Sequence, residues 1–202
     1  MEFSLIYRMA GLSVFGSWFV FAVVWIFLFI KYARGRRKQS IKTRIRDPKS
    51  MIGIVLQAIG FFIIFSVHRD LSYSLQFPGI LFYSLTLLAI LMAPLSVVFA
   101  VYAVLTLGHQ WSFAARLIDN HKLITGGPYR VVRHPIYFTF FGLFLSTAFV
   151  ITPALSLVTA TVLFITGTNM RIRAEEGLLL EQFGDEYREY RKKVRMFIPF
   201  IY

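Results

Sequence analysis

Hydrophobic residues occur along this chain in five long uncharged runs, separated by short polar or strongly basic stretches. The runs span residues 9–30, 51–67, 71–108, 136–151 and 154–170. An α-helix rises about 1.5 Å per residue, so roughly 20 apolar residues cross a hydrocarbon core about 30 Å thick. The first run is also longer than the apolar core of a cleaved signal peptide. The pattern predicts an all-α, polytopic membrane fold of about five transmembrane helices.

The last two runs are joined by only two residues, Thr152 and Pro153, which indicates a tight helical hairpin. Each arm is about 25 Å long at this rise, slightly shorter than the hydrocarbon core. The arms either cross the bilayer fully or thin it locally. In either case the two ends of the hairpin lie on the same side of the membrane. Pro94 lies within the third run, and we expect it to kink that helix because proline lacks a backbone donor.

Twenty of the 22 Lys and Arg residues fall on one side of this arrangement. Nine lie between residues 31 and 49, four lie in the loop 109–135 and seven lie from residue 171 onward, whereas Arg8 and Arg69 lie on the other side. The positive-inside rule places the N-terminus outside, and the central loop and a C-terminal helix in the cytoplasm. The net charge is +12, and we expect these basic residues to contact anionic lipid headgroups rather than nucleic acid.

The composition agrees with a single membrane domain over residues 1–202, since 57% of the residues are hydrophobic and 22 are Phe. Residues 1–107 supply the first three helices and the basic loop 31–50, which could be a loop or an interfacial helix. Residues 108–202 form the predicted cofactor-binding and catalytic region. The chain contains no cysteine, which excludes disulfides, thiolate metal sites and cysteine nucleophiles.

Several familiar catalytic motifs are missing from the sequence. There is no Gly-x-Gly, which excludes the dinucleotide fingerprint, and the phosphate-binding P-loop is also absent. The four histidines have no metal-ligand spacing, and no Gly-x-Ser-x-Gly indicates a hydrolase. Any cofactor must therefore be held, without a metal, by the membrane helices and their connecting loops.

The segment Gly127–Tyr137 is rich in Pro, Tyr, Arg and His and directly precedes the fourth run. Its opening Gly-Pro pair predicts a turn in which backbone amides can approach a ligand. Pro135 suits the first position of a helix, whose free amides could receive a carboxylate together with Arg133. The rings of Tyr129 and Tyr137 could face a cation. The alternative is a membrane-interface belt of Tyr, Arg and His, which explains one such residue more easily than the whole cluster.

Arg171 and Glu175 lie at the end of the fifth run, four residues apart and on one helix face. Such a pair could bind a zwitterion, because the acid can take an ammonium and the arginine a carboxylate. The alternative is a surface ion pair of little energetic value. We favour that alternative for Glu176 and for residues 181–195, which indicate a solvated, mixed-charge helix interrupted near Gly184.

These segments together resemble the isoprenylcysteine carboxyl methyltransferase family, which is grouped with the phospholipid N-methyltransferases. The resemblance covers about residues 108–199 and rests on four patterns: His121-x-Leu123, Gly127-Pro128-Tyr129 with Arg133-His134-Pro135-x-Tyr137, Arg171-x-x-x-Glu175-Glu176, and Phe183-Gly184-x-x-Tyr187-x-x-Tyr190.

The resemblance implies a membrane-embedded methyltransferase that uses S-adenosylmethionine and releases S-adenosylhomocysteine. By the family pattern the cofactor would contact His121, Leu123, Tyr129, His134, Pro135 and Tyr137. Gly127, Arg133 and Glu175 complete the expected cofactor site, and Arg171 with Glu175 forms the expected catalytic corner.

The methyl acceptor is expected to be hydrophobic or lipid-like, and a carboxylate is favoured because it carries no proton to remove. An amine of a phospholipid and a hydrophobic thiol remain alternatives within the methyltransferases. Two other classes stay open at this point: an NADPH-dependent sterol-type reductase and a non-enzymatic membrane sensor. The oligomeric state and the identity of the acceptor are not set by the sequence.

Overall fold

Five α-helices make up most of the described part of the chain, as the hydrophobic pattern predicts. The structure, a computed structural model, describes residues 2–36, 41–44, 48–68, 79–111, 116–118 and 121–198. The helices are α1 (Glu2–Arg36), α2 (Pro48–Ser66), α3 (Gly79–Leu107), α4 (Pro135–Ile151) and α5 (Ala154–Lys193). All but α4 are long and apolar enough to cross a membrane, and α4 is a shorter apolar helix of 17 residues.

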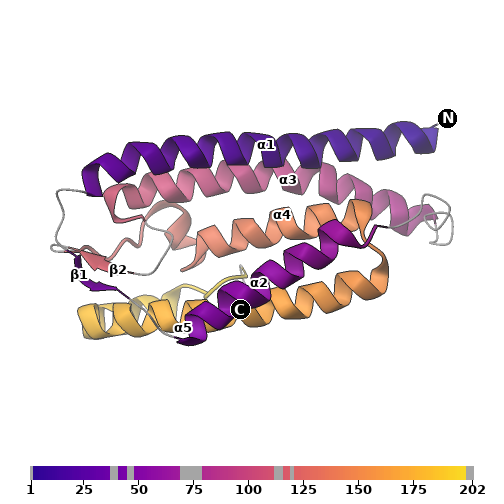
Figure 1. Cartoon of the computed structure of the whole chain (residues 1–202). Helices are drawn as coiled ribbons and strands as arrows, with labels where there is room; N and C mark the ends of the chain where they lie inside the picture. Colours follow the sequence, from indigo (N-terminus) through magenta and orange to yellow (C-terminus); the bar gives the residue numbers. More distant parts are fainter. Residues whose placement is uncertain are drawn as a thin grey trace.

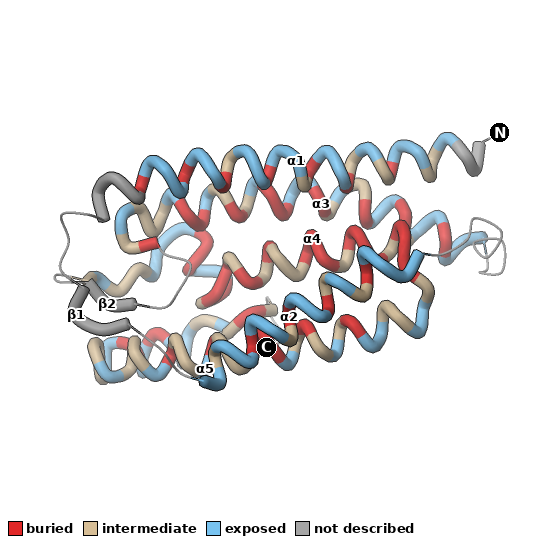
Figure 2. Tube along the Cα trace, in the orientation of Figure 1, coloured by how far each residue is buried: buried red, intermediate tan, exposed pale blue. Residues whose placement is uncertain are grey.

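Helix α4 lies at the centre of the bundle. Figure 1 shows α1, α3 and α4 side by side, with α2 and α5 packed together on the other side of α4. Exposed positions cover the outer faces of α1 and α2, while buried positions predominate along α4 (Figure 2). This placement explains how a short helix is accommodated, because protein rather than lipid surrounds most of α4.

Small residues bring neighbouring helices close together. A Cβ atom built on Gly53 of α2 would lie 2.6 Å from the carbonyl oxygen of Gly167 on α5, closer than such atoms approach. A Cβ atom on Gly142 of α4 would lie 2.1 Å from the Ser96 hydroxyl oxygen on α3. Membrane helices associate largely through such close backbone contact, because lipid tails are as apolar as their side chains.

The tight hairpin is confirmed, since only Thr152 and Pro153 separate α4 from α5. The Thr152 hydroxyl donates a hydrogen bond of 3.2 Å to the carbonyl of Ile64, which ties the hairpin to the end of α2. Helix α3 continues through Pro94, whose side chain is exposed.

Two short strands were not predicted. Strand β1 (Ile41–Arg44) pairs antiparallel with β2 (Arg116–Ile118), so the basic segment after α1 is joined to the loop that precedes α4. The helical fold class stands, and this small sheet is an addition at one end of the bundle, visible at the left of Figure 1.

Candidate active site

A cavity of about 280 Å³ lies at the end of the bundle where α4 begins and α3 ends. Its walls come from all five helices and from the loop between α3 and α4. The volume is close to the lower end of small-molecule pockets in proteins, which are usually lined by apolar groups with a few convergent polar ones. This cavity has that composition, so it is the candidate active site.

The deep part of the cavity is aromatic. Trp25, Phe61, Phe140 and Phe164 line it, one from each of α1, α2, α4 and α5. These rings pack edge-on, with Trp25 and Phe140 having centroids 5.7 Å apart. Since the four residues lie inside the apolar helices, this part of the cavity suits a hydrophobic group at membrane depth.

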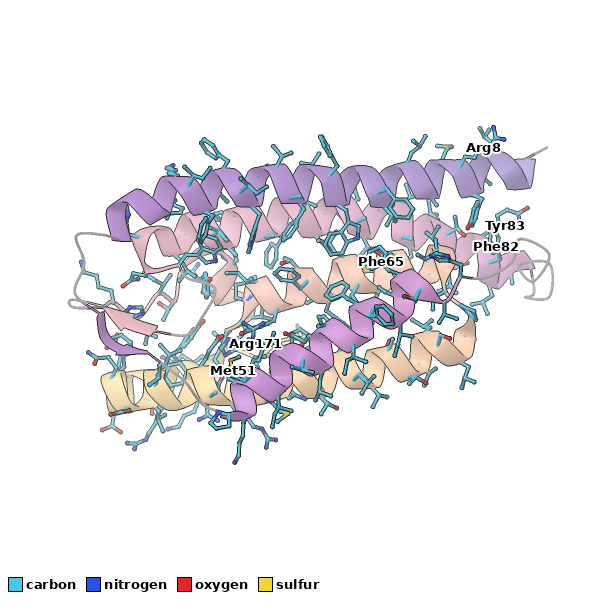
Figure 3. The ribbon with its side chains drawn as sticks, in the orientation of Figure 1. Arg8, Met51, Phe65, Phe82, Tyr83 and Arg171 are labelled. Atoms are coloured by element: carbon cyan, nitrogen blue, oxygen red, sulfur yellow. The ribbon has the colours of Figure 1, made fainter. Side chains whose placement is uncertain are left out.

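The polar part of the cavity gathers around Tyr137 on the first turn of α4. The Tyr137 hydroxyl donates a hydrogen bond to the Glu175 carboxylate, and the Arg171 guanidinium lies over the Tyr137 ring at 5.0 Å from its centroid. Arg171 and Glu175 share one face of α5, as their spacing predicts, and Tyr137 contacts both. Figure 3 shows Arg171 beside the first half of α2, near Met51 and far from Arg8.

Pro135 occupies the first position of α4, with His134 immediately before it as the N-cap. Pro135 costs the helix nothing there, because the first amides of a helix have no intrahelical partner. The His134 ring is buried between two acids, with Nε2 3.3 Å from Glu176 and Nδ1 3.6 Å from Glu175. Burial opposes the charged form of His134, but the hydrogen bonds and charges of Glu175 and Glu176 outweigh it and raise its pKa above the ordinary 6.5.

The C-terminal segment, residues 190–198, folds back onto the loop before α4, whereas the sequence predicted a solvated tail. Backbone amides of Arg133 and His134 donate to the carbonyls of Arg195 and Met196, at 2.8 and 3.0 Å. The Tyr190 hydroxyl donates a hydrogen bond of 2.5 Å to the Tyr129 carbonyl. The interruption near Gly184 is confirmed, because this residue has φ of 51° inside α5.

Glu176 was expected on a solvated surface, and this expectation is wrong. Its side chain is 7% exposed and accepts a hydrogen bond of 2.8 Å from Arg133 Nε. The second carboxylate oxygen of Glu176 lies 3.5 Å from Arg191 Nε. Its burial follows from the folding back of the C-terminal segment, which covers this face of α5.

The same contacts change the role expected of Arg133. Its guanidinium also donates to the Val194 carbonyl at 2.5 Å, so it already has several protein partners. Arg133 lines the cavity, but its hydrogen bonds join the loop before α4 to Glu176 and to the C-terminal segment. Its position therefore indicates an anchoring role rather than an open carboxylate receptor.

The loop before α4 forms one wall of the cavity through His121, Leu123 and Tyr129. Gln110, just after α3, holds this loop through two hydrogen bonds to the backbone of Lys122, of 2.6 and 3.2 Å. Tyr129 is buried, and burial together with the nearby Glu175 charge raises the pKa of its phenol well above the ordinary value. Tyr129 is therefore a neutral group at physiological pH.

The structure brings together all the sequence-predicted site residues except Gly127. The residues that line the cavity are His121, Leu123, Tyr129, Arg133, His134, Pro135, Tyr137, Arg171 and Glu175. Gly127 instead has φ of 59° and faces α3, where a Cβ atom would lie 3.1 Å from the Tyr102 hydroxyl oxygen. Glycine suits this position because the turn needs a positive φ and packs tightly on α3.

Among the polar residues of the cavity, sequence reasoning missed Gln57 on α2. A buried amide in the middle of an apolar membrane helix is costly and often functional, so this position could have been noticed. Within the described residues, no group of three or more His, Cys, Asp or Glu side chains is arranged to hold a metal ion.

Residues 85–181 match the isoprenylcysteine carboxyl methyltransferase family. The chain is also 34% identical over 140 residues to a probable protein-S-isoprenylcysteine O-methyltransferase of Oryza sativa subsp. indica, a match that covers 68% of this chain and 73% of the rice protein. The chain belongs to the isoprenylcysteine carboxyl methyltransferase family. It is accordingly a multi-pass membrane methyltransferase, which decides against the reductase and the non-enzymatic sensor.

Two further family members extend the comparison. The protein-S-isoprenylcysteine O-methyltransferase of Saccharomyces cerevisiae is 34% identical over 146 residues, covering 68% of this chain and 61% of the yeast enzyme. The solved structure of the eukaryotic intramembrane Ras methyltransferase ICMT matches with a TM-score of 0.53 at 25% identity. That match covers 78% of this chain and 54% of the solved chain.

Proposed function

We propose that this methyltransferase uses S-adenosylmethionine to methylate the carboxylate of a hydrophobic, lipid-like acceptor. The observation that carries the proposal is the continuity of the cavity. A polar corner formed by Arg171, Glu175 and Tyr137 opens onto an aromatic part at membrane depth. A water-soluble donor and an apolar acceptor can meet only where both environments adjoin.

The residues of the cavity fit the chemistry of S-adenosylmethionine, which is a zwitterion with a sulfonium and an adenine ring. Glu175 offers an acceptor for an ammonium, and the faces of Tyr129 and Tyr137 suit a cation or a flat ring. His121, Leu123, His134 and Pro135 complete this side of the cavity. When bound, the cofactor supplies a methyl group already activated by its positive sulfur, so the protein has mainly to align the two reactants.

A carboxylate acceptor agrees best with the polar corner. Arg171 can hold a carboxylate by a bidentate contact, and no proton has to be removed from it. An amine acceptor would need a base, but Glu175 already accepts the Tyr137 hydrogen bond and lies beside His134. The relatives are named for isoprenylcysteine, a cysteine carrying an isoprenyl chain, and the aromatic part of the cavity would suit such a chain.

The product of the reaction tests the proposal directly. Purified protein in detergent is incubated with methyl-labelled S-adenosylmethionine and an N-acetylated cysteine carrying a farnesyl thioether. We expect a methyl ester, which mild base converts to volatile labelled methanol, whereas N-methyl and S-methyl products keep the label. The matched acceptor with a carboxamide in place of the carboxylate should take no label. Calorimetry should show S-adenosylhomocysteine binding that survives EDTA, and its loss on chelation would contradict the metal-free site.

Two substitutions test the assigned corner in the same assay. Arg171→Ala and Glu175→Gln should each lower turnover about a hundredfold or more, because a lost charge-assisted contact to a reacting group costs on the order of 2–4 kcal/mol. Arg173→Ala is the matched control, since Arg173 is an exposed arginine two residues further along α5. Near-normal turnover of Arg171→Ala, with the control unchanged, would remove Arg171 from the mechanism.

A further inference from the structure

The side chain of Gln57 on helix α2 lines the cavity and contacts Arg171. The residue is 8% exposed, in a helix that is otherwise apolar through most of its length. A buried amide is costly unless its polar atoms are hydrogen-bonded. Both ends of this amide are satisfied: the carbonyl oxygen accepts from Arg171 Nη1 at 2.9 Å, and the nitrogen donates to the Thr168 hydroxyl at 2.8 Å.

The orientation of this amide follows from the chemistry of its partners. A guanidinium can only donate, so the carbonyl oxygen of Gln57 must face Arg171. The amide nitrogen then faces the Thr168 hydroxyl, which can accept. Thr168 and Arg171 lie three residues apart on α5, so one side chain of α2 contacts two neighbouring positions of the catalytic helix.

Backbone packing holds Gln57 against this part of α5. One turn before Gln57, a Cβ atom on Gly53 would lie 2.8 Å from Cγ of Arg171, so α2 rests directly on the aliphatic part of that side chain. The Tyr137 ring packs against the guanidinium from α4. Arg171 is thus contacted along its stem by Gly53 and at its charged end by Gln57 and Tyr137.

We propose that Gln57 is a positioning residue for methyl transfer, which orients the Arg171 guanidinium to receive the acceptor carboxylate. This inference rests on the function proposed above for Arg171. An uncharged amide suits the role, because it binds the guanidinium without bringing a second negative charge that would compete with the acceptor. Helix α2 therefore takes part in the reaction, although the family match begins only at residue 85.

The test separates binding of the acceptor from binding of the cofactor. Gln57→Met keeps a side chain of similar length without the amide, and should raise the KM for the acceptor about tenfold, since hydrogen bonds to charged groups have effects of this size. The Kd of S-adenosylhomocysteine should stay within twofold. Gln57→Glu should raise the acceptor KM further, because its carboxylate competes for the guanidinium.

Thr152→Val is the matched control, because it removes a different hydrogen bond to α2, at the far end of that helix. Its acceptor KM should remain within twofold of the wild type. An equal rise in KM for Thr152→Val and Gln57→Met would show that loosened packing of α2 is the cause, and would overturn the proposal.

A double substitution distinguishes this inference from the proposed function. If Gln57 acts through Arg171, adding Gln57→Met to Arg171→Ala should change the acceptor KM no further. Additive effects would contradict the positioning role. Absence of the methyl ester with the wild type would reject the proposed function itself, whereas a raised KM for Arg171→Ala with a normal KM for Gln57→Met would reject only the role of Gln57.

Discussion

Glu176 illustrates at the residue scale how tertiary structure decides what a charged side chain does. From sequence, its position next to Glu175 turns it about 100° around the helix, away from the catalytic face. The structure surrounds it with Arg133, His134 and Arg191 and leaves its side chain 7% exposed. A helix angle predicts which face a residue occupies, but it cannot predict that a later segment folds back and covers that face.

We therefore expect Glu176→Ala to be strongly destabilising. Removing one partner of a buried ion pair leaves an uncompensated charge and typically costs about 3–5 kcal/mol. Thermal unfolding in detergent should show a large drop in the melting temperature of Glu176→Ala. Glu181→Ala, an exposed acid on the same helix, is the control and should melt close to the wild type.

The contacts of His134 with Glu175 and Glu176 predict that the stability of the protein depends on pH. The pKa of His134 is raised in the folded state, so its stabilising contribution is complete below the unfolded value of 6.5 and is lost as pH rises through the folded-state pKa. The melting temperature of the wild type should fall across that interval. Glu176→Gln removes one of the two acids that raise this pKa, so its melting temperature should depend less on pH. An equal pH dependence in both proteins would contradict the assignment.

At the scale of elements, the helices were predictable because hydrophobic runs, proline positions and the two-residue hairpin are local features of the sequence. The β1–β2 pair was not, because it joins segments more than 70 residues apart and neither strand has a hydrophobic alternation. The packing of the C-terminal segment was missed for a related reason. Its contacts with the loop before α4 use backbone groups throughout, as partners of other backbone groups or of the Arg133 and Tyr190 side chains. A backbone carbonyl can accept a hydrogen bond whatever the residue, so the sequence does not mark these positions.

The contact between α2 and α5 makes a prediction at this scale. A Cβ atom on Gly167 would lie 2.5 Å from the Gly53 carbonyl oxygen, so Gly167→Ala must push the two helices apart. Overpacking of this kind typically costs about 1–3 kcal/mol, and it would also displace Gln57 from Arg171. Gly16→Ala on α1 is the matched control, because no atom of another element lies within 4 Å of a Cβ atom there. A melting temperature of Gly167→Ala equal to that of the control would contradict the close approach.

At the scale of the whole molecule, strands β1 and β2 and the end of α5 lie at one end of the bundle, while the N-terminus and Arg8 lie at the other (Figures 1 and 3). The cavity belongs to the first of these ends, because residues where α3 ends and α4 begins line it. This arrangement follows from the odd number of helices, which puts the start of α1 and the end of α5 at opposite ends. The helical fold was therefore accessible from hydrophobicity and connectivity, whereas the depth and shape of the cavity depend on side chains from all five helices.

The sidedness of the protein remains a prediction, and the absence of cysteine makes it directly measurable. The distribution of Lys and Arg predicts that the end with the cavity faces the cytoplasm, because positively charged loops are retained there. His68 follows α2 and Arg130 lies beside the cavity, at opposite ends of the bundle, and both side chains are exposed. Single cysteines at these positions should differ toward a membrane-impermeant maleimide on intact cells: His68→Cys should label, and Arg130→Cys should label only after the membrane is opened. Labelling of Arg130→Cys on intact cells would reverse the orientation and place the cavity outside. A cytosolic donor such as S-adenosylmethionine could not then reach it, so this experiment tests the proposed cofactor as well as the topology.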